Sequence, residues 1–233
     1  MCVCREGEPA LNQLSPEEAR QVLTVALPKG RLFAPSVAFL STIGAGSCAL
    51  DYLDRELSVV DLQAGFRYLL VRPSDVVTYV AEGAADVGIV GKDVLLEQEG
   101  AVYELVDLGF GECHLAVAAP ADAVDGYCDA DDFYRTRGES LRVATKYPQF
   151  ASQYFATRGM RVRVIALRGS VELAPLVGLA DVIVDLVSTG ETLRANGLVE
   201  VEHVADIAAR LVVNPVSLKV RPEVEDLLGP LAR

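Results

Sequence analysis

Short apolar runs alternate with longer segments of mixed polarity along most of the chain. Runs rich in Val, Leu and Ile are typical of buried strands, and the Ala- and Leu-rich segments between them are typical of helices. This alternation predicts an α/β fold. The expected strands are 22–27, 66–71, 85–90, 102–108, 113–118, 141–145, 162–166, 181–186, 198–204 and 211–213. Helices are expected from residue 32, over 73–80, after 93, over 149–157 and 171–179, from 193 and from 222.

The order of these elements predicts two α/β lobes. We expect the chain to cross between them near 112–120 and 200–205, on two strands, with the active site in the cleft between the lobes. The expected division is an N-terminal extension at 1–20, lobe I at 21–114 and 204–233, and lobe II at 115–203. A polar, acidic segment at 121–138 has no assigned role.

The charge balance narrows the function classes. The chain has 233 residues and a formal net charge of −12, from 33 acidic and 21 basic residues. This balance disfavours nonspecific binding to nucleic acid or to an anionic membrane, because both need a basic surface. An acidic protein that binds polyphosphates must gather its few cations at one place.

The termini and the cysteines bear on location. Met1 to Glu8 has no apolar core, so we expect no signal peptide. Leu32 to Leu50 is uncharged, but its Pro and Gly residues make a poor membrane span. The five cysteines are odd in number and scattered, so we expect no disulfide framework and a cytoplasmic location. Cys2 and Cys4 are expected to bind no metal, because structural zinc needs four ligands.

Cations follow three of the predicted strands. Lys29-Gly30-Arg31 comes after strand 22–27, Arg72 after 66–71, and Gly91-Lys92-Asp93 after 85–90. Open α/β sheets bind ligands at the carboxyl ends of their strands, so these turns predict a polyanion site. The alternatives are solvated basic turns and, for Asp93, a helix N-cap. Arg55 alone would be interpreted as a surface charge.

A second candidate site begins where strand 181–186 ends. Ser188, Thr189, Gly190, Glu191 and Thr192 form a hydroxyl- and glycine-containing turn that opens a helix. Such turns hold phosphate, because glycine allows close approach and the amides at a helix start point toward an anion. Asp185 lies just upstream and would favour a hydroxyl-rich group, so the pattern favours a sugar phosphate. The alternative is an ordinary connection with a Ser or Thr N-cap.

The stretch from Glu172 to Leu193 resembles the signature of the ATP phosphoribosyltransferase family, the first enzyme of histidine biosynthesis. The matching positions are Glu172, Gly178, Ala180, Ile183, Asp185-Leu186 and Thr189-Gly190-x-Thr192-Leu193. Further matches lie in the same order within Leu23 to Lys219: Leu27-Pro28-Lys29-Gly30-Arg31, Arg55-x-Leu57, Arg72-x-x-Asp75, Asp86-Val87-Gly88-Ile89-Val90-Gly91-x-Asp93, Tyr147-Pro148 and Gly169-Ser170-Val171-Glu172-Leu173-Ala174-Pro175.

The resemblance implies a fold like that of the type II periplasmic binding proteins. It also implies the reaction, in which phosphoribosyl pyrophosphate and ATP give N1-(5-phosphoribosyl)-ATP and pyrophosphate, with Mg²⁺. The chain resembles the short form of the family, which lacks a C-terminal regulatory domain. Short-form enzymes work with a regulatory subunit that resembles the catalytic core of histidyl-tRNA synthetase, so we expect a hetero-octamer and self-association of this chain.

The resemblance also suggests roles for the residues. The 5-phosphate is expected on Ser188 to Thr192, with Asp185 on the ribose hydroxyls and Glu172 on the ribose or, through water, on Mg²⁺. Lys29, Arg31 and Arg55 are expected to stabilise the departing pyrophosphate, and Arg72 with Gly91-Lys92-Asp93 to face ATP. No residue is expected to be a direct Mg²⁺ ligand, since the substrate phosphates hold the ion. Glu172 has the alternative role of a helix-start carboxylate.

Two further points remain open at this level. His114 and His203 fall on the proposed crossing strands, and we expect them to be buried structural histidines rather than a catalytic pair.

A solute-binding protein of the same fold and a phosphoribosyltransferase that acts on another base are rival functions. The carboxylates and the loop disfavour the first, and the missing pair of adjacent acidic residues before the loop disfavours the second.

Overall fold

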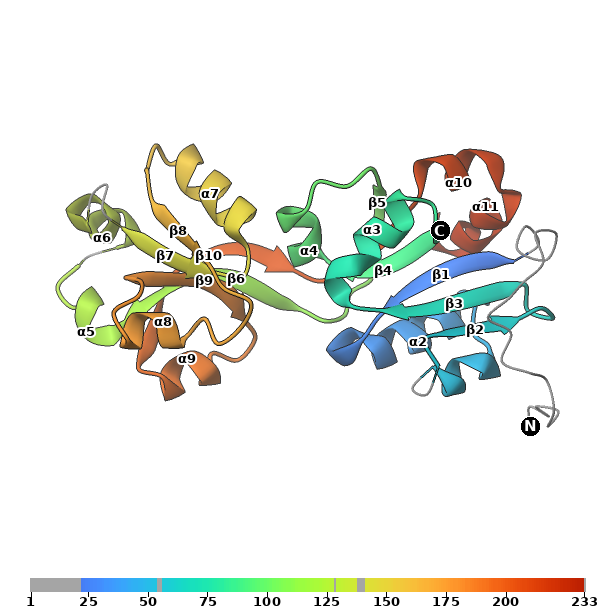
Figure 1. Cartoon of the computed structure of the whole chain (residues 1–233), viewed down its shortest axis with the longest axis horizontal. Helices are drawn as coiled ribbons and strands as arrows, with labels where there is room; N and C mark the ends of the chain where they lie inside the picture. The colour runs from blue at the N-terminus through green and yellow to red at the C-terminus, as the bar shows by residue number, and fades with distance from the viewer. Residues whose placement is uncertain (1–21, 54–55, 128, 138–140, 233) are drawn as a thin grey trace. The chain divides into compact units, whose positions relative to one another are not determined.

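The computed structural model describes residues 22–53, 56–127, 129–137 and 141–232. The chain divides into two compact units, each with its own β-sheet (Figure 1). Unit 1 comprises Met1–Gly111 and Ala208–Arg233, and unit 2 comprises Glu112–Ile207. These boundaries lie a few residues from the expected ones at 114/115 and 203/204. The reason is that β6 (Cys113–Pro120) and β10 (Leu198–Ile207) pair along their whole length within the sheet of unit 2.

Unit 1 is built on a six-stranded mixed sheet with the order β2-β3-β1-β4-β11-β5. β1 pairs in parallel with β3 and β4, whereas β2 and β11 run antiparallel to their neighbours. The strands are β1 (Leu23–Pro28), β2 (Ser58–Asp61), β3 (Phe66–Val71), β4 (Val87–Gly91), β5 (Tyr103–Asp107) and β11 (Ala209–Val213). The helices are η1 (Gly30–Leu32), α2 (Phe33–Thr42), η2 (Cys48–Tyr52), η3 (Pro73–Asp75), α3 (Val76–Ala81), α4 (Lys92–Glu97), α10 (Pro215–Val220), α11 (Pro222–Leu228) and η5 (Gly229–Ala232).

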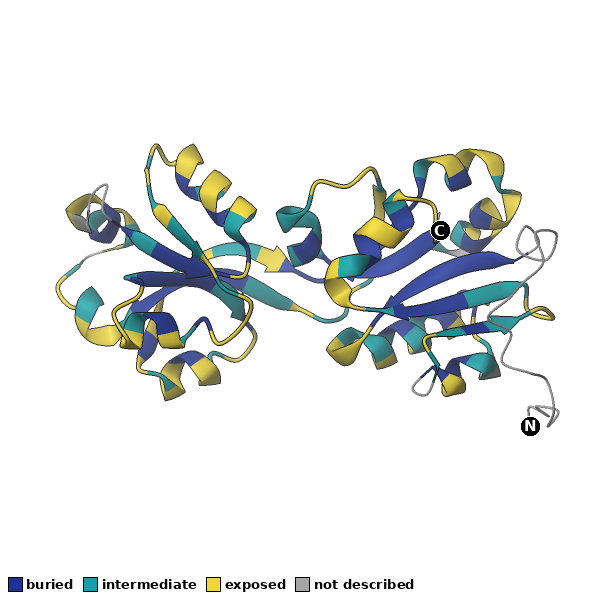
Figure 2. Cartoon of the chain, in the orientation of Figure 1, coloured by how far each residue is buried: buried dark blue, intermediate teal, exposed yellow. Residues whose placement is uncertain are grey.

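Both faces of this sheet are covered, which explains why its central strands β1 and β4 are almost entirely apolar. Leu23, Val25 and Leu27 pack with side chains of α2, η2 and α11, whereas Ala26 packs with those of α3 and α4. Figure 2 shows the resulting buried strands between partly exposed helices. A Cβ atom on Gly88 would lie 2.8 Å from side-chain atoms of two α3 valines, so glycine allows α3 to pack closely on β4.

Buried polar groups join the C-terminal helices to this sheet. Asp86 is buried before β4 and accepts hydrogen bonds from Thr24 N and Ser217 Oγ, and it pairs with Arg221. Asn214 caps α10 by accepting from Val216 N and Ser217 N, and it donates to the carbonyl of Val80. Residues from both ends of the unit 1 sequence therefore share one polar network.

Unit 2 has a five-stranded mixed sheet with the order β10-β6-β9-β7-β8. β7 pairs in parallel with β8 and β9, and β6 pairs antiparallel with β9 and β10. The remaining strands are β7 (Arg142–Thr145), β8 (Arg163–Ala166) and β9 (Val182–Val187). The helices are α5 (Ala121–Val124), α6 (Ala130–Arg137), α7 (Pro148–Thr157), α8 (Leu173–Leu176) and α9 (Glu191–Ala195).

The structure adds several details of unit 2 and of the C-terminal region to the sequence predictions. The 181–186 strand, β9, is parallel to β7 and antiparallel to β6. The polar segment 121–138 contains α5 and α6, because α6 buries Phe133 in an aromatic cluster with Tyr134. The predicted strand 198–204 is part of β10, which forms the edge of the unit 2 sheet and ends at Ile207, directly before unit 1 resumes at Ala208. Helix α10 was not predicted.

No helix in the described part of the chain is both long enough and apolar enough to cross a membrane.

Candidate active site

The carboxyl end of β9 opens into a cavity of about 170 Å³ within unit 2. The predicted phosphate loop and both predicted carboxylates contribute to its wall, although Glu172 precedes the loop in sequence by sixteen residues or more. The geometry therefore brings the predicted unit 2 site residues together. The lining residues are Glu172, Ile183, Asp185, Leu186, Val187, Ser188, Thr189, Gly190, Glu191, Thr192 and Leu193.

Gly190 determines how the loop enters α9. It is the N-cap of this helix with φ 71°, a left-handed conformation that favours glycine. The N-cap is therefore glycine and not the Ser or Thr of the alternative interpretation. Thr189 Oγ1 nevertheless accepts a hydrogen bond from Glu191 N at 3.4 Å. Arg194 Nη2 donates to the carbonyl of Thr189 at 2.9 Å and holds the loop from the following helical turn.

The two carboxylates reach the cavity from different elements. Asp185 lies on β9, is partly buried, and accepts from Leu186 N at 2.8 Å. It pairs across the ladder with Ala116, which leaves room beside it. Glu172 is the residue before α8 rather than a residue inside the helix. Ser170, two residues earlier, has φ 49°, the one positive φ of a non-glycine residue in the described chain, so the backbone approaching Glu172 is strained.

Arg142 supports this site from the neighbouring strand and was not identified from the sequence. Its Nε and Nη2 atoms bind Asp181 at 3.1 and 2.9 Å, and Nη1 donates to the carbonyl of Gly178 at 2.7 Å. The hydrogen bonds to Asp181 raise the pKa of Arg142. Because the partners are separated by more than thirty residues, no local pattern signals this contact. Arg142 thereby fixes the chain between α8 and β9.

The predicted cationic turns of unit 1 share one edge of its sheet. β3, β1 and β4 are adjacent and parallel, so their carboxyl ends lie side by side. Lys29, Arg31 and Arg72 are exposed at this edge, and Gly30 adopts φ 81°. The amide of Lys29 donates to the carbonyl of Val71 at 2.8 Å, which ties the first turn to the end of β3. Arg55 lies outside the described residues.

The turn after β4 is engaged in contacts of its own. Lys92 Nζ lies 2.5 Å from Glu104 Oε2. Glu104 in turn contacts Arg210, which also pairs with Asp107. The N-cap of α4 is Gly91, whereas Asp93 lies in the first helical turn. A Cβ atom on Gly91 would lie 2.1 Å from Asp93 Oδ1, so a larger residue there would force this carboxylate to move.

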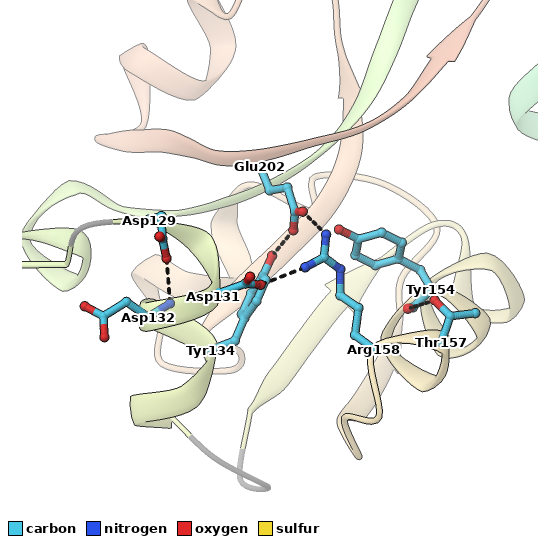
Figure 3. Close-up of polar contacts among 8 residues, drawn as sticks. All are labelled: Asp129, Asp131, Asp132, Tyr134, Tyr154, Thr157, Arg158 and Glu202. Atoms are coloured by element: carbon cyan, nitrogen blue, oxygen red, sulfur yellow. Dashed lines mark hydrogen bonds and ion pairs between the residues drawn. The ribbon is translucent and has the colours of Figure 1, made fainter.

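A larger cavity of about 400 Å³ lies elsewhere in unit 2, beside α6 and the end of α7. Asp131, Tyr134 and Arg158 at its wall make polar contacts within the protein (Figure 3). Arg158 binds Glu202 and contacts Asp131 at 3.0 Å, and the hydroxyl of Tyr134 donates to Glu202 at 2.9 Å. Burial and the charge of Glu202 raise the pKa of Tyr134 far above its ordinary value. This cluster ties α6 and α7 to β10, so the smaller cavity is the better candidate for chemistry.

Comparisons with known proteins show which family the chain resembles. The family model HisG, ATP phosphoribosyltransferase, matches residues 72–233. An ATP phosphoribosyltransferase of Geobacter metallireducens is 49% identical over 212 residues, which cover 91% of this chain and 97% of the relative. A solved ATP phosphoribosyl transferase (HisG:HisZ) complex from Thermotoga maritima contains a chain that is 33% identical, with a TM-score of 0.72, over 89% of this chain and 98% of that chain.

More distant structures agree in fold alone. The alkanesulfonate-binding protein SsuA from Xanthomonas axonopodis pv. citri is 11% identical, with a TM-score of 0.50, and the match covers 90% of this chain and 71% of that chain. The expected likeness to periplasmic binding proteins is thus confirmed. Because the family model covers more than half of the chain and the Geobacter relative is nearly half identical, this chain belongs to the ATP phosphoribosyltransferase family of enzymes.

Proposed function

We propose that this chain transfers the phosphoribosyl group of phosphoribosyl pyrophosphate to N1 of ATP, which gives N1-(5-phosphoribosyl)-ATP and pyrophosphate in the first step of histidine biosynthesis. The observation that carries the proposal is the β9 cavity, where the Gly190 loop and two carboxylates meet. The loop can hold a phosphate, and the carboxylates beside it can accept hydrogen bonds from hydroxyl groups. This arrangement matches the phosphate and the ribose of a 5-phosphoribosyl group.

The 5-phosphate binds on the loop from Ser188 to Thr192. The first amides of a helix have no partner within the helix, and they carry the positive end of its dipole. The hydroxyls of Ser188, Thr189 and Thr192 supply further donors. Binding energy gained at the 5-phosphate, away from the reacting C1, holds the sugar in its reactive position.

Asp185 accepts hydrogen bonds from the ribose hydroxyls. Its negative charge also favours the positive charge that develops at C1 as the bond to pyrophosphate lengthens. Glu172 contacts the ribose, or Mg²⁺ through water. The N1 atom of ATP is an uncharged nucleophile, so the residues need to align it rather than deprotonate it.

The cationic edge of unit 1 serves the phosphates. Lys29 and Arg31, together with Arg55, stabilise the charge that grows on the departing pyrophosphate. Arg72 and the Gly91-Lys92-Asp93 turn contact ATP. Lys92 forms an ion pair with Glu104. To contact a phosphate of ATP, Lys92 must therefore break this ion pair.

The residues fit Mg²⁺ that is carried by the substrate. Asp185 and Glu172 are the two predicted carboxylates at the β9 cavity, and Mg²⁺ in such sites takes few protein ligands and several phosphate oxygens. When bound, Mg²⁺ would offset part of the negative charge of the pyrophosphate. The three-residue cluster with metal-ligand geometry among the described residues consists of His114, Glu200 and His203 and does not include these two carboxylates.

The chain acts in the cytoplasm with a regulatory subunit that resembles the catalytic core of histidyl-tRNA synthetase, in a hetero-octamer. Support comes from the Thermotoga maritima structure, which is described as a HisG:HisZ complex and whose matched chain is covered over 98% of its length. All the residues that line the β9 cavity belong to unit 2 of this chain.

The test is to incubate the purified chain with ATP, phosphoribosyl pyrophosphate and Mg²⁺, and to follow product absorbance with and without the regulatory subunit. We expect product with ATP and none when a free purine or pyrimidine base replaces ATP. Turnover with a free base would indicate the rival phosphoribosyltransferase. Binding without turnover under every condition would indicate a solute-binding protein and contradict the proposal.

A further inference from the structure

A cluster of side chains with metal-ligand geometry lies at the edge of the unit 2 sheet. His114 on β6 and His203 and Glu200 on β10 place one ligand atom each so that all three atoms lie within 4.8 Å of one another. These are the only two histidines in the 233-residue chain. They were expected to be buried structural histidines, but the side chain of His203 is 50% exposed and that of His114 is 22% exposed.

Two irregularities in the β6–β10 ladder create this cluster. Glu200, His203 and Asp206 are spaced three residues apart, so in a regular strand their side chains would alternate between the two faces of the sheet. The register shifts between Glu200 and Glu202, and again between His203 and Ala205. As a result the three residues lie opposite Ala118, Ala116 and His114, which are spaced two residues apart on one face. β-Bulges are known to re-aim side chains in this way.

The side chains already converge without a metal ion. His114 Nε2 lies 3.0 Å from Glu200 Oε2, and His203 Nε2 lies 3.0 Å from Asp206 Oδ1. The two imidazole rings stack with centroids 4.6 Å apart and an interplanar angle of 19°. The opposing residues Ala116 and Ala118 are small, so the rings have room to turn.

We propose that His114, Glu200 and His203 bind a divalent transition-metal ion, with Zn²⁺ as the best match. Two imidazoles and a carboxylate suit Zn²⁺, whereas Mg²⁺ prefers oxygen ligands alone. Tetrahedral Zn²⁺ with bonds of about 2.1 Å holds its ligand atoms about 3.4 Å apart, so the ligand atoms need to draw together by little more than about 1 Å. Asp206 orients the ring of His203 through the nitrogen that does not bind the metal.

A bound ion would cross-link the edge strand β10 to β6. The ion binds the folded chain and not the unfolded chain, so it stabilises unit 2 in proportion to its concentration and affinity. None of its three ligands is among the residues that line the β9 cavity.

The experiment measures metal binding by the full-length chain, free of affinity tags and treated with chelator. Cys2 and Cys4 are changed to Ser in every sample, because a Cys-x-Cys pair can bind zinc on its own. Calorimetry with Zn²⁺ should give one ion per chain. The visible absorption of Co²⁺ at the same site should show nitrogen and oxygen ligands and no thiolate charge-transfer band. Zn²⁺ should also raise the melting temperature, and Mg²⁺ at the same concentration should not.

Single substitutions identify the ligands. His203→Ala should weaken Zn²⁺ binding by about 100-fold and abolish the thermal shift, since loss of even a supporting partner costs about 10- to 100-fold. Glu200→Gln is a second, milder variant, and Glu225→Gln removes an exposed carboxylate of α11 as a matched control. Unchanged Zn²⁺ affinity in both site variants, a thiolate band with Co²⁺, or no binding by the parent chain would overturn the proposal.

Discussion

Arg221 Nη1 lies 2.8 Å from Asp86 Oδ2, a contact between residues 135 positions apart in the chain. The same carboxylate oxygen accepts from Thr24 N at 2.8 Å, and Arg221 Nη2 donates to the carbonyl of Val22 at 2.9 Å. Both side chains are mostly buried, with 17% and 11% of their surface exposed. This pair therefore anchors the C-terminal helices to the first strand of unit 1.

Arg221→Ala should lower the free energy of unfolding by about 3 kcal/mol, because it leaves the buried Asp86 carboxylate without its cation. Urea denaturation of the variant and the parent measures the difference. Asp226→Ala, which removes an exposed carboxylate of α11, should change stability by less than about 0.5 kcal/mol. A loss in Arg221→Ala no larger than that of the control would show that the pair contributes little.

Gly190→Ala should raise the KM for phosphoribosyl pyrophosphate about tenfold. An alanine at φ 71° costs about 1–2 kcal/mol, and its Cβ would lie 3.0 Å from Arg194 Nη1, so the loop must shift away from its phosphate-binding shape. Steady-state kinetics with saturating ATP measures the effect.

Gly197→Ala is the matched control for this change. Gly197 has φ 67° just after α9, with no atom within 4 Å of the added Cβ, so the substitution carries the same backbone cost away from the loop. Its KM should stay at the parental value. Equal KM values in the two variants would mean that the loop does not bind the 5-phosphate.

Arg31→Ala should lower kcat about 100-fold with a smaller change in the KM for phosphoribosyl pyrophosphate. The reason is that Arg31 acts on charge that appears as pyrophosphate departs, and loss of one such donor costs about 10²- to 10³-fold in kcat. Lys219→Ala removes an exposed cation of α10 and should leave both constants unchanged. A raised KM with parental kcat would assign Arg31 to ground-state binding.

The sequence predicted those parts of the molecule whose residues interact locally. The strand predicted at 66–71 coincides with β3, and the strand predicted at 85–90 overlaps β4, because buried strands between covering helices leave largely apolar runs. The loop at Ser188 to Thr192 was located because a strand end, a glycine and a helix start follow one another directly. Helix α10 was missed, although Asn214-Pro215 is a standard helix-start signal.

Contacts across the fold were beyond such patterns. Arg142 binds Asp181 and Gly178 only because β7 and β9 are neighbours, and nothing near Arg142 in the sequence indicates this pairing. His114 and His203 meet because two register shifts rotate residues of β10 onto one face. In a regular strand, side chains alternate between the two faces, which would place Glu200 and His203 on opposite faces of the sheet. The β-bulges break this alternation, so the sequence pattern alone does not predict that the two side chains meet.

Tyr68 should make stability depend on alkaline pH. Its ring is fully buried in unit 1, and its hydroxyl donates to the carbonyl of Ala45 at 2.8 Å. Burial first, and then the charge of Asp61, raise the pKa of Tyr68 above its ordinary value of about 10. The unfolded chain therefore releases this proton before the folded chain does. The stabilisation is complete below about pH 10 and is lost as the pH rises further.

Tyr68→Phe should cost about 1 kcal/mol at neutral pH through the lost hydrogen bond. Above about pH 10 the difference between parent and variant should shrink by up to about 1.4 kcal/mol per pH unit, because only the parent loses stability through this group. Urea denaturation at neutral pH and at about pH 10.5 measures both quantities. Tyr103→Phe removes an exposed hydroxyl of β5 and serves as the control for general alkaline effects. A constant difference between parent and Tyr68→Phe at all pH values would show that this hydroxyl does not couple folding to proton release.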